Sequence, residues 1–249
     1  MATIVKFVTI NLWGVVMPKR WLVLFLMFYN LAQANTLDEA KLKVQQKDFA
    51  AARAIYLDLA NAGDAKACFN LGLMYHDGDG VTKNIEEAVN WYKKSAQLNY
   101  KEAQYTLASL VFNREIQSIS YANAVQYYQQ AAELGHVKSQ LNLGMLHYRG
   151  DVITQNLNAA FKWLSLAASN NNSEAEGYLA HLYLQGIGVE QDVVKAAMWL
   201  LLATENEDKR FTNKHTKILN YTASQMSPEQ IDQAISMAKS CKNQHFTAC

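Results

Sequence analysis

Apolar and small residues recur at helical spacing in two neighbouring stretches, residues 65–76 and 85–98. Positions i, i+3, i+4 and i+7 share one face of a helix, so each stretch predicts a helix with one buried stripe. The two stripes are Cys68, Leu71, Gly72 and Tyr75, and then Ala88, Trp91, Tyr92 and Ala96. Between them, Asp77-Gly78-Asp79-Gly80 is typical of a turn because glycine supplies backbone freedom. The pattern predicts a hairpin of two helices.

The same pattern returns every 36 residues without gaps, in segments 65–100, 101–136, 137–172 and 173–208. One column holds Leu71, Leu107, Leu143 and Leu179, and another holds Trp91, Tyr127, Trp163 and Trp199. One hairpin cannot bury its apolar face alone, whereas stacked hairpins form a continuous core. We therefore expect an all-α, right-handed superhelical solenoid. The aromatic column is interpreted as core packing rather than as a ligand-binding box.

Segments on either side of the four repeats are predicted to cap the solenoid. In residues 35–64 the second helix of a hairpin is visible in phase, preceded by a short, charged first helix, as expected of a terminal repeat with a polar outer face. After residue 208 the period is lost, and residues 209–249 are expected to form capping helices and a tail. There, Ser227-Pro228-Glu229-Gln230 predicts a helix start with a capping box between Ser227 and Gln230.

Residues 1–34 have the pattern of a secretory signal. Pro18-Lys19-Arg20 precedes the apolar run Trp21 to Tyr29, and Ala32-Gln33-Ala34 matches a cleavage site. We expect cleavage after Ala34 and a periplasmic or secreted protein. Met17 is a plausible true start, which would make residues 1–16 an over-extended gene prediction. The alternative is an uncleaved membrane anchor.

The repeat resembles the Sel1-like repeat (SLR) family, relatives of the tetratricopeptide repeats. The matching residues run from Ala65 to Val81 in the pattern A-x-A-x-x-x-L-G-x-x-Y-x-x-G-x-G-V, and from Lys83 to Ala96 in the pattern K-x-x-E-x-A-x-x-W-Y-x-x-A, with a serine at position 95. The second repeat departs most, because its turn Asn113-Arg114-Glu115-Ile116 contains no glycine. The resemblance implies a helical scaffold that acts mostly as an adaptor.

A face of each repeat's first helix varies between repeats, and in tetratricopeptide-like solenoids this face lines a concave groove. We expect partner binding there, while the alternative is an ordinary solvated face. The charged column Lys66, Glu102, Lys138 and Glu174 alternates in sign and is expected to form ion pairs between repeats. The candidate partner-binding residues are Asn70, Leu73, Asn142, Met145, Tyr178 and His181.

Little in the sequence points to catalysis, a metal or a cofactor. The six histidines are scattered without zinc-ligand spacing, and neither a nucleophile elbow nor a phosphate-binding loop is present. Without residues 1–34 the chain keeps 20 of its 23 basic residues against 22 acidic residues, and no basic stripe remains. We therefore expect no catalytic residue, no metal, no cofactor and no nucleic-acid partner.

Three cysteines are present. Cys241 and Cys249 are close in the tail and predict a disulfide if the chain is exported, the alternative being two free thiols at a frayed end. Cys68 shares its column with Gln104, Gln140 and Glu176, so we expect a partly exposed, unreactive thiol.

These observations predict an exported, monomeric scaffold that binds a protein or peptide in a concave groove. The resemblance to the Sel1-like repeat family implies a role in a bacterial envelope, secretion, signalling or host-interaction pathway. Contact with a membrane is expected only through an uncleaved leader. The alternative is a scaffold for peptidoglycan or polysaccharide machinery. A cell-wall-active hydrolase is a weaker hypothesis, because the chain lacks regularly paired cysteines.

Overall fold

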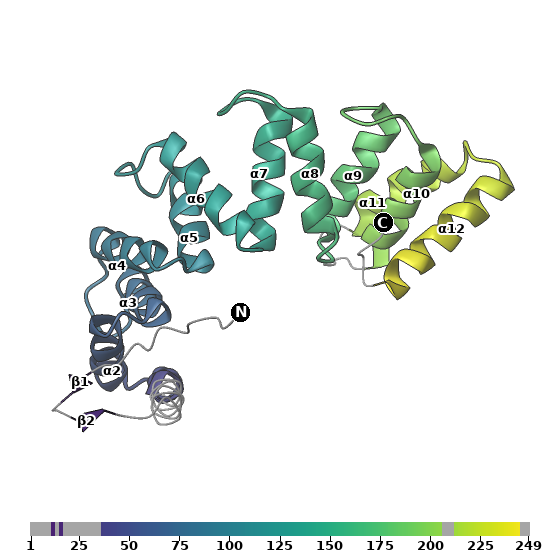
Figure 1. Ribbon diagram of the computed structural model, residues 1–249. Coiled ribbons are helices and arrows are strands. Elements are labelled where there is room, and N and C mark those ends of the chain that lie inside the picture. The colour runs from purple at the N-terminus through teal and green to yellow at the C-terminus, as the bar shows by residue number, and fades with distance from the viewer. Residues whose placement is uncertain (1–10, 13–14, 17–35, 206–211, 245–249) are drawn as a thin grey trace, which may run out of the picture. The chain divides into compact units, whose positions relative to one another are not determined.

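A computed structural model describes residues 11–12, 15–16, 36–205 and 212–244 (Figure 1). Residues 36–45 are helical, and a two-residue antiparallel hairpin pairs β1 (Asn11–Leu12) with β2 (Val15–Val16). The expected leader, residues 1–34, otherwise lies outside the described residues. The further helices are α2 (Phe49–Asn61), α3 (Ala65–Asp77), α4 (Ile85–Gln97), α5 (Lys101–Phe112), α6 (Tyr121–Glu133), α7 (Val137–Arg149), α8 (Leu157–Ala168), α9 (Ser173–Gln185), α10 (Val193–Glu205), α11 (Thr212–Ala223) and α12 (Pro228–Asn243).

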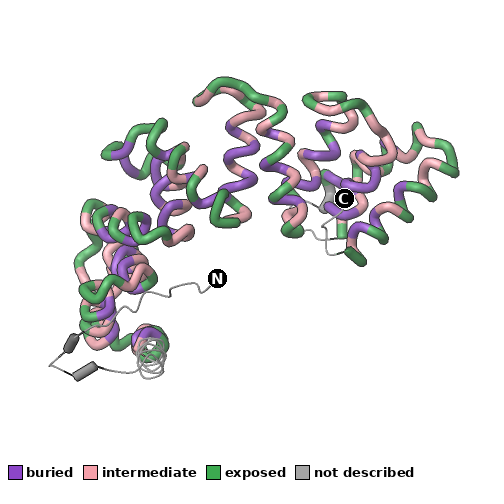
Figure 2. Tube along the Cα trace, viewed as in Figure 1, coloured by how far each residue is buried: buried purple, intermediate pink, exposed green. Residues whose placement is uncertain are grey.

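The chain divides into two compact units, residues 1–94 and 95–249. In the second unit, α5 packs on α6, α6 on α7, and so on through α10, so sequence neighbours are spatial neighbours. Figure 2 shows that most buried residues lie on the helices and that most turn residues are partly or fully exposed. The all-α fold built from helix-turn-helix repeats is confirmed.

Helix starts repeat with the same 36-residue period as the apolar columns. The second helix of each hairpin begins after a residue whose side-chain oxygen accepts a hydrogen bond from a backbone N–H of the first turn. This satisfies a donor that the helix itself leaves unpaired and stabilises each start by about 1 kcal/mol. The capping residues are Asp48, Asn84, Ser120, Asn156 and Asp192.

First helices have a less regular capping column. Asp64, His136 and Asn172 cap α3, α7 and α9 through their side chains. Tyr100 occupies the corresponding position before α5 and makes no side-chain capping bond, although its backbone is extended in the same way.

Close packing within a hairpin depends on small residues. Gly144 of α7 lies against α8, where an added Cβ would come within 2.8 Å of Leu164 Cγ. In the first unit an added Cβ on Gly72 would come within 2.4 Å of the Tyr92 ring. These distances are shorter than a van der Waals contact, so a larger residue at either position would force the two helices apart.

Three of the four first helices end at a glycine in the left-handed backbone region. Gly78, Gly150 and Gly186 adopt it at the ends of α3, α7 and α9, with φ of 86°, 68° and 65°. In the second repeat Arg114 occupies the same column with φ of 61°. The turn without glycine therefore keeps a left-handed residue in this column, although α5 itself ends earlier, at Phe112, with the right-handed Asn113 as its C-cap. The Arg114 side chain lies in a backbone region that disfavours it.

The second glycine of the turn has a different role. An added Cβ on Gly80 would come within 2.3 Å of Phe49 Cβ, and one on Gly188 within 3.0 Å of Leu157 Cβ. Phe49 and Leu157 begin the second helix of the preceding hairpin. Glycine is needed here because the turn backbone packs directly on that helix start.

The column that contains Cys68 is buried, which corrects the expectation of a partly exposed thiol. Cys68 is 2% exposed, and Gln104 and Glu176 of the same column are 1% and 0% exposed. Gln104 and Gln140 donate from Nε2 to the carbonyl oxygens of Ala96 and Ala132, at 3.3 Å and 3.1 Å. The column therefore faces the end of the preceding second helix and not the solvent.

The C-terminal helices close the second unit. Both α11 and α12 pack on α10, whose residues 196–200 are all buried. The capping box of α12 is present, with Ser227 and Gln230 each bonding to the other's backbone N–H. Cys241 is buried in α12. Cys249 lies outside the described residues, so the disulfide stays a prediction.

Candidate interaction surface

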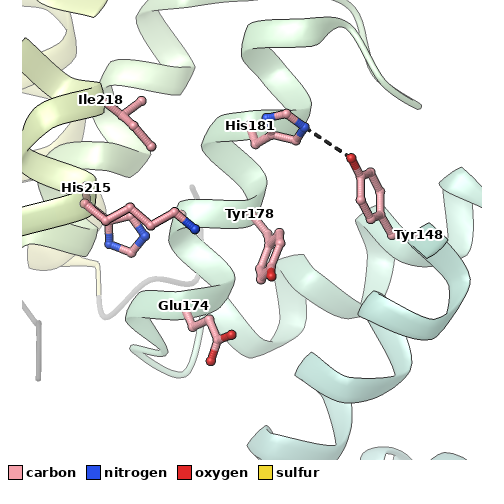
Figure 3. A pocket seen from close by; sticks show the side chains of 8 residues that line it. Tyr148, Glu174, Tyr178, His181, His215 and Ile218 are labelled. Carbon is pink, nitrogen blue, oxygen red and sulfur yellow. Dashed lines mark hydrogen bonds between the residues drawn. The ribbon is translucent and has the colours of Figure 1, made fainter. Parts of the chain in front are cut away.

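A hollow of about 250 Å³ opens between α7, α9 and α11 (Figure 3). Tyr148 comes from α7 and His215 and Ile218 come from α11, while the remaining labelled residues belong to α9. Residues i, i+4 and i+7 of a helix share one face, which explains why Glu174, Tyr178 and His181 point to the same side of α9.

A hydrogen bond crosses the mouth of this hollow. The hydroxyl of Tyr148 and Nε2 of His181 are 3.2 Å apart, and the two rings meet edge to face with centroids 6.2 Å apart. The dashed line in Figure 3 marks this bond, which joins two neighbouring first helices. His181 is exposed, so its outer ring edge is accessible from solvent.

The wall on the α11 side depends on a glycine. An added Cβ on Gly177 would come within 2.3 Å of His215 Nε2, so glycine leaves the space on α9 that the His215 imidazole of α11 fills. His215 is 6% exposed, and Lys214 beside it is exposed at the rim. The hollow therefore combines a buried imidazole with a solvated ammonium group.

A second hollow, of about 280 Å³, adjoins the first. The two share Glu174 and Tyr178, so they form one groove along the first helices of three successive repeats. We call these two hollows together the shared groove. The residues that line only the second hollow include Phe112, Tyr128, Asn142, Met145 and Arg149.

Tyr178 stands where the two hollows meet. Burial raises the pKa of its hydroxyl, the charge of Glu174 raises it further, and the charge and hydrogen bond of Arg149 oppose these effects. The phenol is therefore neutral at physiological pH and can both donate and accept a hydrogen bond. Its ring packs against the core, as does Met145, so the groove floor is an edge of the hydrophobic core.

Four of the six predicted partner-binding residues line the shared groove. They are Asn142, Met145, Tyr178 and His181. The other two belong to α3 of the first unit and line neither hollow. Asn70 there donates from Nδ2 to the carbonyl oxygen of Lys66 at 2.9 Å, and Leu73 is half-buried. Whether all six bind one partner stays a prediction.

The expected ladder of ion pairs is absent from the part of the chain that the structure describes. Lys138 forms no salt bridge with Glu102 or Glu174 among the ion pairs of residues 36–205 and 212–244. Lys138 and Glu174 are exposed, and holding such side chains in one geometry costs about as much free energy as the attraction returns.

Several groove residues could not be identified from the repeat pattern. Lys214, His215 and Ile218 follow the end of the period and have no counterparts in the four repeats. Gly177 stands out in the sequence as a glycine inside a predicted helix, which usually signals a packing or functional reason. The glycine therefore predicts a close contact at position 177, but it does not identify His215 as the residue that packs there.

The described residues contain no group of three or more His, Cys, Asp or Glu side chains that could hold a metal ion. Within the same residues, no helix combines the length and apolar character needed to cross a bilayer. The side chains that line the shared groove are aromatic, amide, apolar and charged.

Comparisons with known proteins agree with this architecture. A Sel1 repeat protein from Oxalobacter formigenes is 28% identical, with a TM-score of 0.68, over 84% of this chain and 87% of that one. The protective antigen c5321 of uropathogenic Escherichia coli, which displays an SLR fold, is 22% identical with a TM-score of 0.50, over 86% of this chain and 55% of that one. The second likeness concerns the fold alone.

Among curated proteins, the DAP3-binding cell death enhancer 1 of Rattus norvegicus is 42% identical over 62 residues. The match covers 25% of this chain and only 12% of the rat protein. The Sel1 repeat model itself matches four consecutive segments, 65–100, 101–136, 137–172 and 173–208, which together make up more than half of the 249 residues. The chain therefore belongs to the Sel1 repeat family, whose members are protein-interaction scaffolds.

Proposed function

We propose that this chain is an exported adaptor that binds an extended segment of another protein in the shared groove. The observation that carries the proposal is the continuity of the two hollows through Tyr178 and Glu174. Each hollow is smaller than a typical small-molecule pocket, which has about 300–1,000 Å³. Two adjoining small hollows suit successive side chains of an extended segment better than they suit one compact ligand.

The chemistry of the groove supports a peptide that carries both apolar and charged groups. Tyr178 and Met145 provide aromatic and thioether surface, which is enriched at the centre of protein interfaces. Arg149 and Lys214 offer positive charge at the rim, and Glu174 offers negative charge between them. A bound segment would bury apolar side chains on the floor and exchange hydrogen bonds with the rim. The proposed role is binding, with no catalytic step.

Photocrosslinking in intact cells tests this role. We would place a photoreactive amino acid at position 145, and a matched control at position 166, where Leu166 is exposed on the second helix α8. We expect one partner to crosslink at 145 and not at 166. Tyr178→Ala together with His181→Ala should abolish the crosslink without lowering the melting temperature by more than a few degrees. Equal crosslinking at both positions, or a crosslink that survives the substitutions, would exclude the groove.

Export is a separate part of the proposal. It rests on the basic, apolar and small-residue order of residues 18–34. The intact mass of the protein recovered from the periplasm or the medium should correspond to a chain that begins at Asn35. A protein that remains with the membranes and retains residues 1–34 would instead support an uncleaved anchor.

A further inference from the structure

A second cleft, of about 340 Å³, lies away from the shared groove, where the end of α4 meets α6. Side-chain amides dominate its lining, and none of its lining residues is charged. One wall is a single helix face, since the α6 residues follow one another at i, i+3, i+4 and i+7. The cleft is lined by Ala96, Gln97, Asn99, Asn123, Gln126, Tyr127 and Gln130. We call this site the amide cleft.

The amide cleft occurs where the aromatic column of the repeats changes from tryptophan to tyrosine. Trp163 and Trp199 are 7% and 4% exposed, whereas Tyr127 in the same column is half-buried. Tyr127 is therefore less completely buried than the tryptophans of its column. The phenol ring of Tyr127 is smaller than the indole of a tryptophan, so it fills less of the space beside α6. Part of the Tyr127 side chain is also exposed to solvent.

Residues next to Tyr127 also differ in type from their counterparts in the third repeat. In the third repeat the ammonium group of Lys162 lies 5.3 Å from the centre of the Trp163 ring, and Leu166 follows on the same face. The corresponding residues of α6 are Gln126 and Gln130. The second repeat thus replaces a lysine and an apolar residue with two amides beside its tyrosine.

The five amides of the cleft are available for a ligand. None of them takes part in a side-chain hydrogen bond within residues 36–205 and 212–244. Elsewhere the same residue types are engaged, since Asn156 and Asn172 cap helices and Gln140 bonds to a buried carbonyl. Each free amide offers two donor hydrogens and one acceptor oxygen.

Backbone structure holds the cleft in place. Asn99 adopts a left-handed conformation with φ of 59°, and its N–H donates to the carbonyl oxygen of Ala96 at 3.0 Å. On the other wall, Ser120 caps α6 through a bond from the Asn123 N–H at 3.2 Å. A preorganised site loses less conformational entropy when it binds.

We propose that the amide cleft binds one unit of an uncharged saccharide. A sugar hydroxyl both donates and accepts hydrogen bonds, as does each amide of the lining. The C–H groups of a sugar ring carry slight positive charge and pack well on the negative face of a phenol such as Tyr127. The lack of a charged lining residue disfavours a phosphate, a carboxylate or an ammonium group as the principal contact.

Titration with neutral tetrasaccharides tests the proposal. Chitotetraose, maltotetraose and cellotetraose are each added to the full chain, and binding is followed by calorimetry and by saturation-transfer NMR. We expect at least one of them to bind. The test variant combines Asn123→Ala, Gln126→Lys and Gln130→Leu, which converts the α6 face to the residues of the third repeat. Because α8 folds with those residues, we expect the variant to fold and to bind at least tenfold more weakly.

Two controls make the result specific. Gln129→Leu removes an amide that is on α6 but outside the cleft, and it should leave saccharide affinity unchanged. Tyr178→Ala alters the shared groove and should also have no effect on saccharide binding. The amide-cleft variant should in turn keep the photocrosslink at position 145, so failure of one proposal is distinguishable from failure of the other.

The proposal is wrong if none of the three saccharides binds, or if the triple variant binds as well as the parent chain. Acetyl-tetraglycine amide serves as the competing probe, because side-chain amides also pair with peptide backbone. If this peptide binds in the cleft and the saccharides do not, the amides bind a polypeptide and the saccharide assignment is excluded.

Discussion

Gly144 of α7 lies directly against Leu164 of α8, so that a Cβ atom on residue 144 would come within 2.8 Å of Leu164 Cγ and 3.2 Å of the Leu164 backbone nitrogen. Leu164 is fully buried and packs in the core of the second unit. The glycine therefore sets the distance between the two helices of the third repeat, and it does so inside a helix, where glycine is otherwise unfavourable.

Gly144→Ala tests this relationship. Alanine would improve helix propensity by about 1 kcal/mol, but overpacking costs about 1–3 kcal/mol and should dominate because part of the clash is with backbone. We expect a lower free energy of unfolding in urea. Ala180→Gly, at the corresponding position of α9, serves as the comparison and should cost somewhat more than about 1 kcal/mol, because it loses both helix propensity and a fully buried methyl group. A Gly144→Ala protein more stable than the parent would show that α8 moves away without cost.

Arg114→Gly is expected to stabilise the second repeat. Arg114 has φ of 61° in the column where the other repeats have glycine, and a non-glycine residue in this region costs about 1–2 kcal/mol. Removing the side chain should raise the free energy of unfolding by about 1 kcal/mol, although the more flexible unfolded state reduces the gain. The opposite change, Gly150→Ala, should destabilise, since its Cβ would approach Gln155 Cβ within 2.6 Å. In thermal melts, the melting temperature should rise for Arg114→Gly and fall for Gly150→Ala.

Acid should weaken the start of α7. His136 caps this helix by accepting the Ser139 N–H at Nδ1, at 3.2 Å, which requires an unprotonated nitrogen. Burial lowers the pKa of His136 below 6.5, and the charges of Lys101 and Lys138 lower it further against the opposing effect of Glu102. Below pH 6.5 the unfolded chain therefore binds more protons at His136 than the folded protein does. The stabilisation from His136 is complete above that pH and is lost as the pH falls toward the pKa of the folded protein.

His136→Asn isolates this contribution. Asparagine caps α9 at the corresponding position, Asn172, and it does not titrate. Between pH 7 and pH 5 the melting temperature of the variant should fall less than that of the parent. Burial lowers the pKa of His147 as well, so part of the pH dependence should remain in both proteins. Identical pH profiles would mean that His136 does not link stability to protonation.

Cys68 should resist thiol reagents in the folded protein. It is 2% exposed, and burial raises its pKa, with a smaller opposing effect from Lys94, so little reactive thiolate is present at neutral pH. Alkylation with iodoacetamide, followed by peptide mass spectrometry, should leave Cys68 unmodified in buffer and modify it in urea. Rapid modification without denaturant would show that α3 opens locally.

Much of the fold could be predicted because it is built from local signals that repeat. The 36-residue period defines hairpins whose second helices start at caps such as Asp48, Ser120 or Asn156, and glycine ends the first helix in three of the four repeats. Each signal acts within one turn of helix, so it can be recognised without knowing what packs beside it. The varying face of the first helices likewise identified Asn142, Met145, Tyr178 and His181 as neighbours.

The type, length and order of the helices follow from contacts between residues a few positions apart, so they can be predicted from the amino-acid pattern. Which columns meet a neighbouring hairpin depends instead on how the helices pack in three dimensions. The tertiary structure buries Cys68 and Gln104, brings His215 to Gly177, and opens a cleft beside Tyr127. The physical reason is that burial depends on the distance and rotation between packed helices, which side chains far apart in the sequence set together.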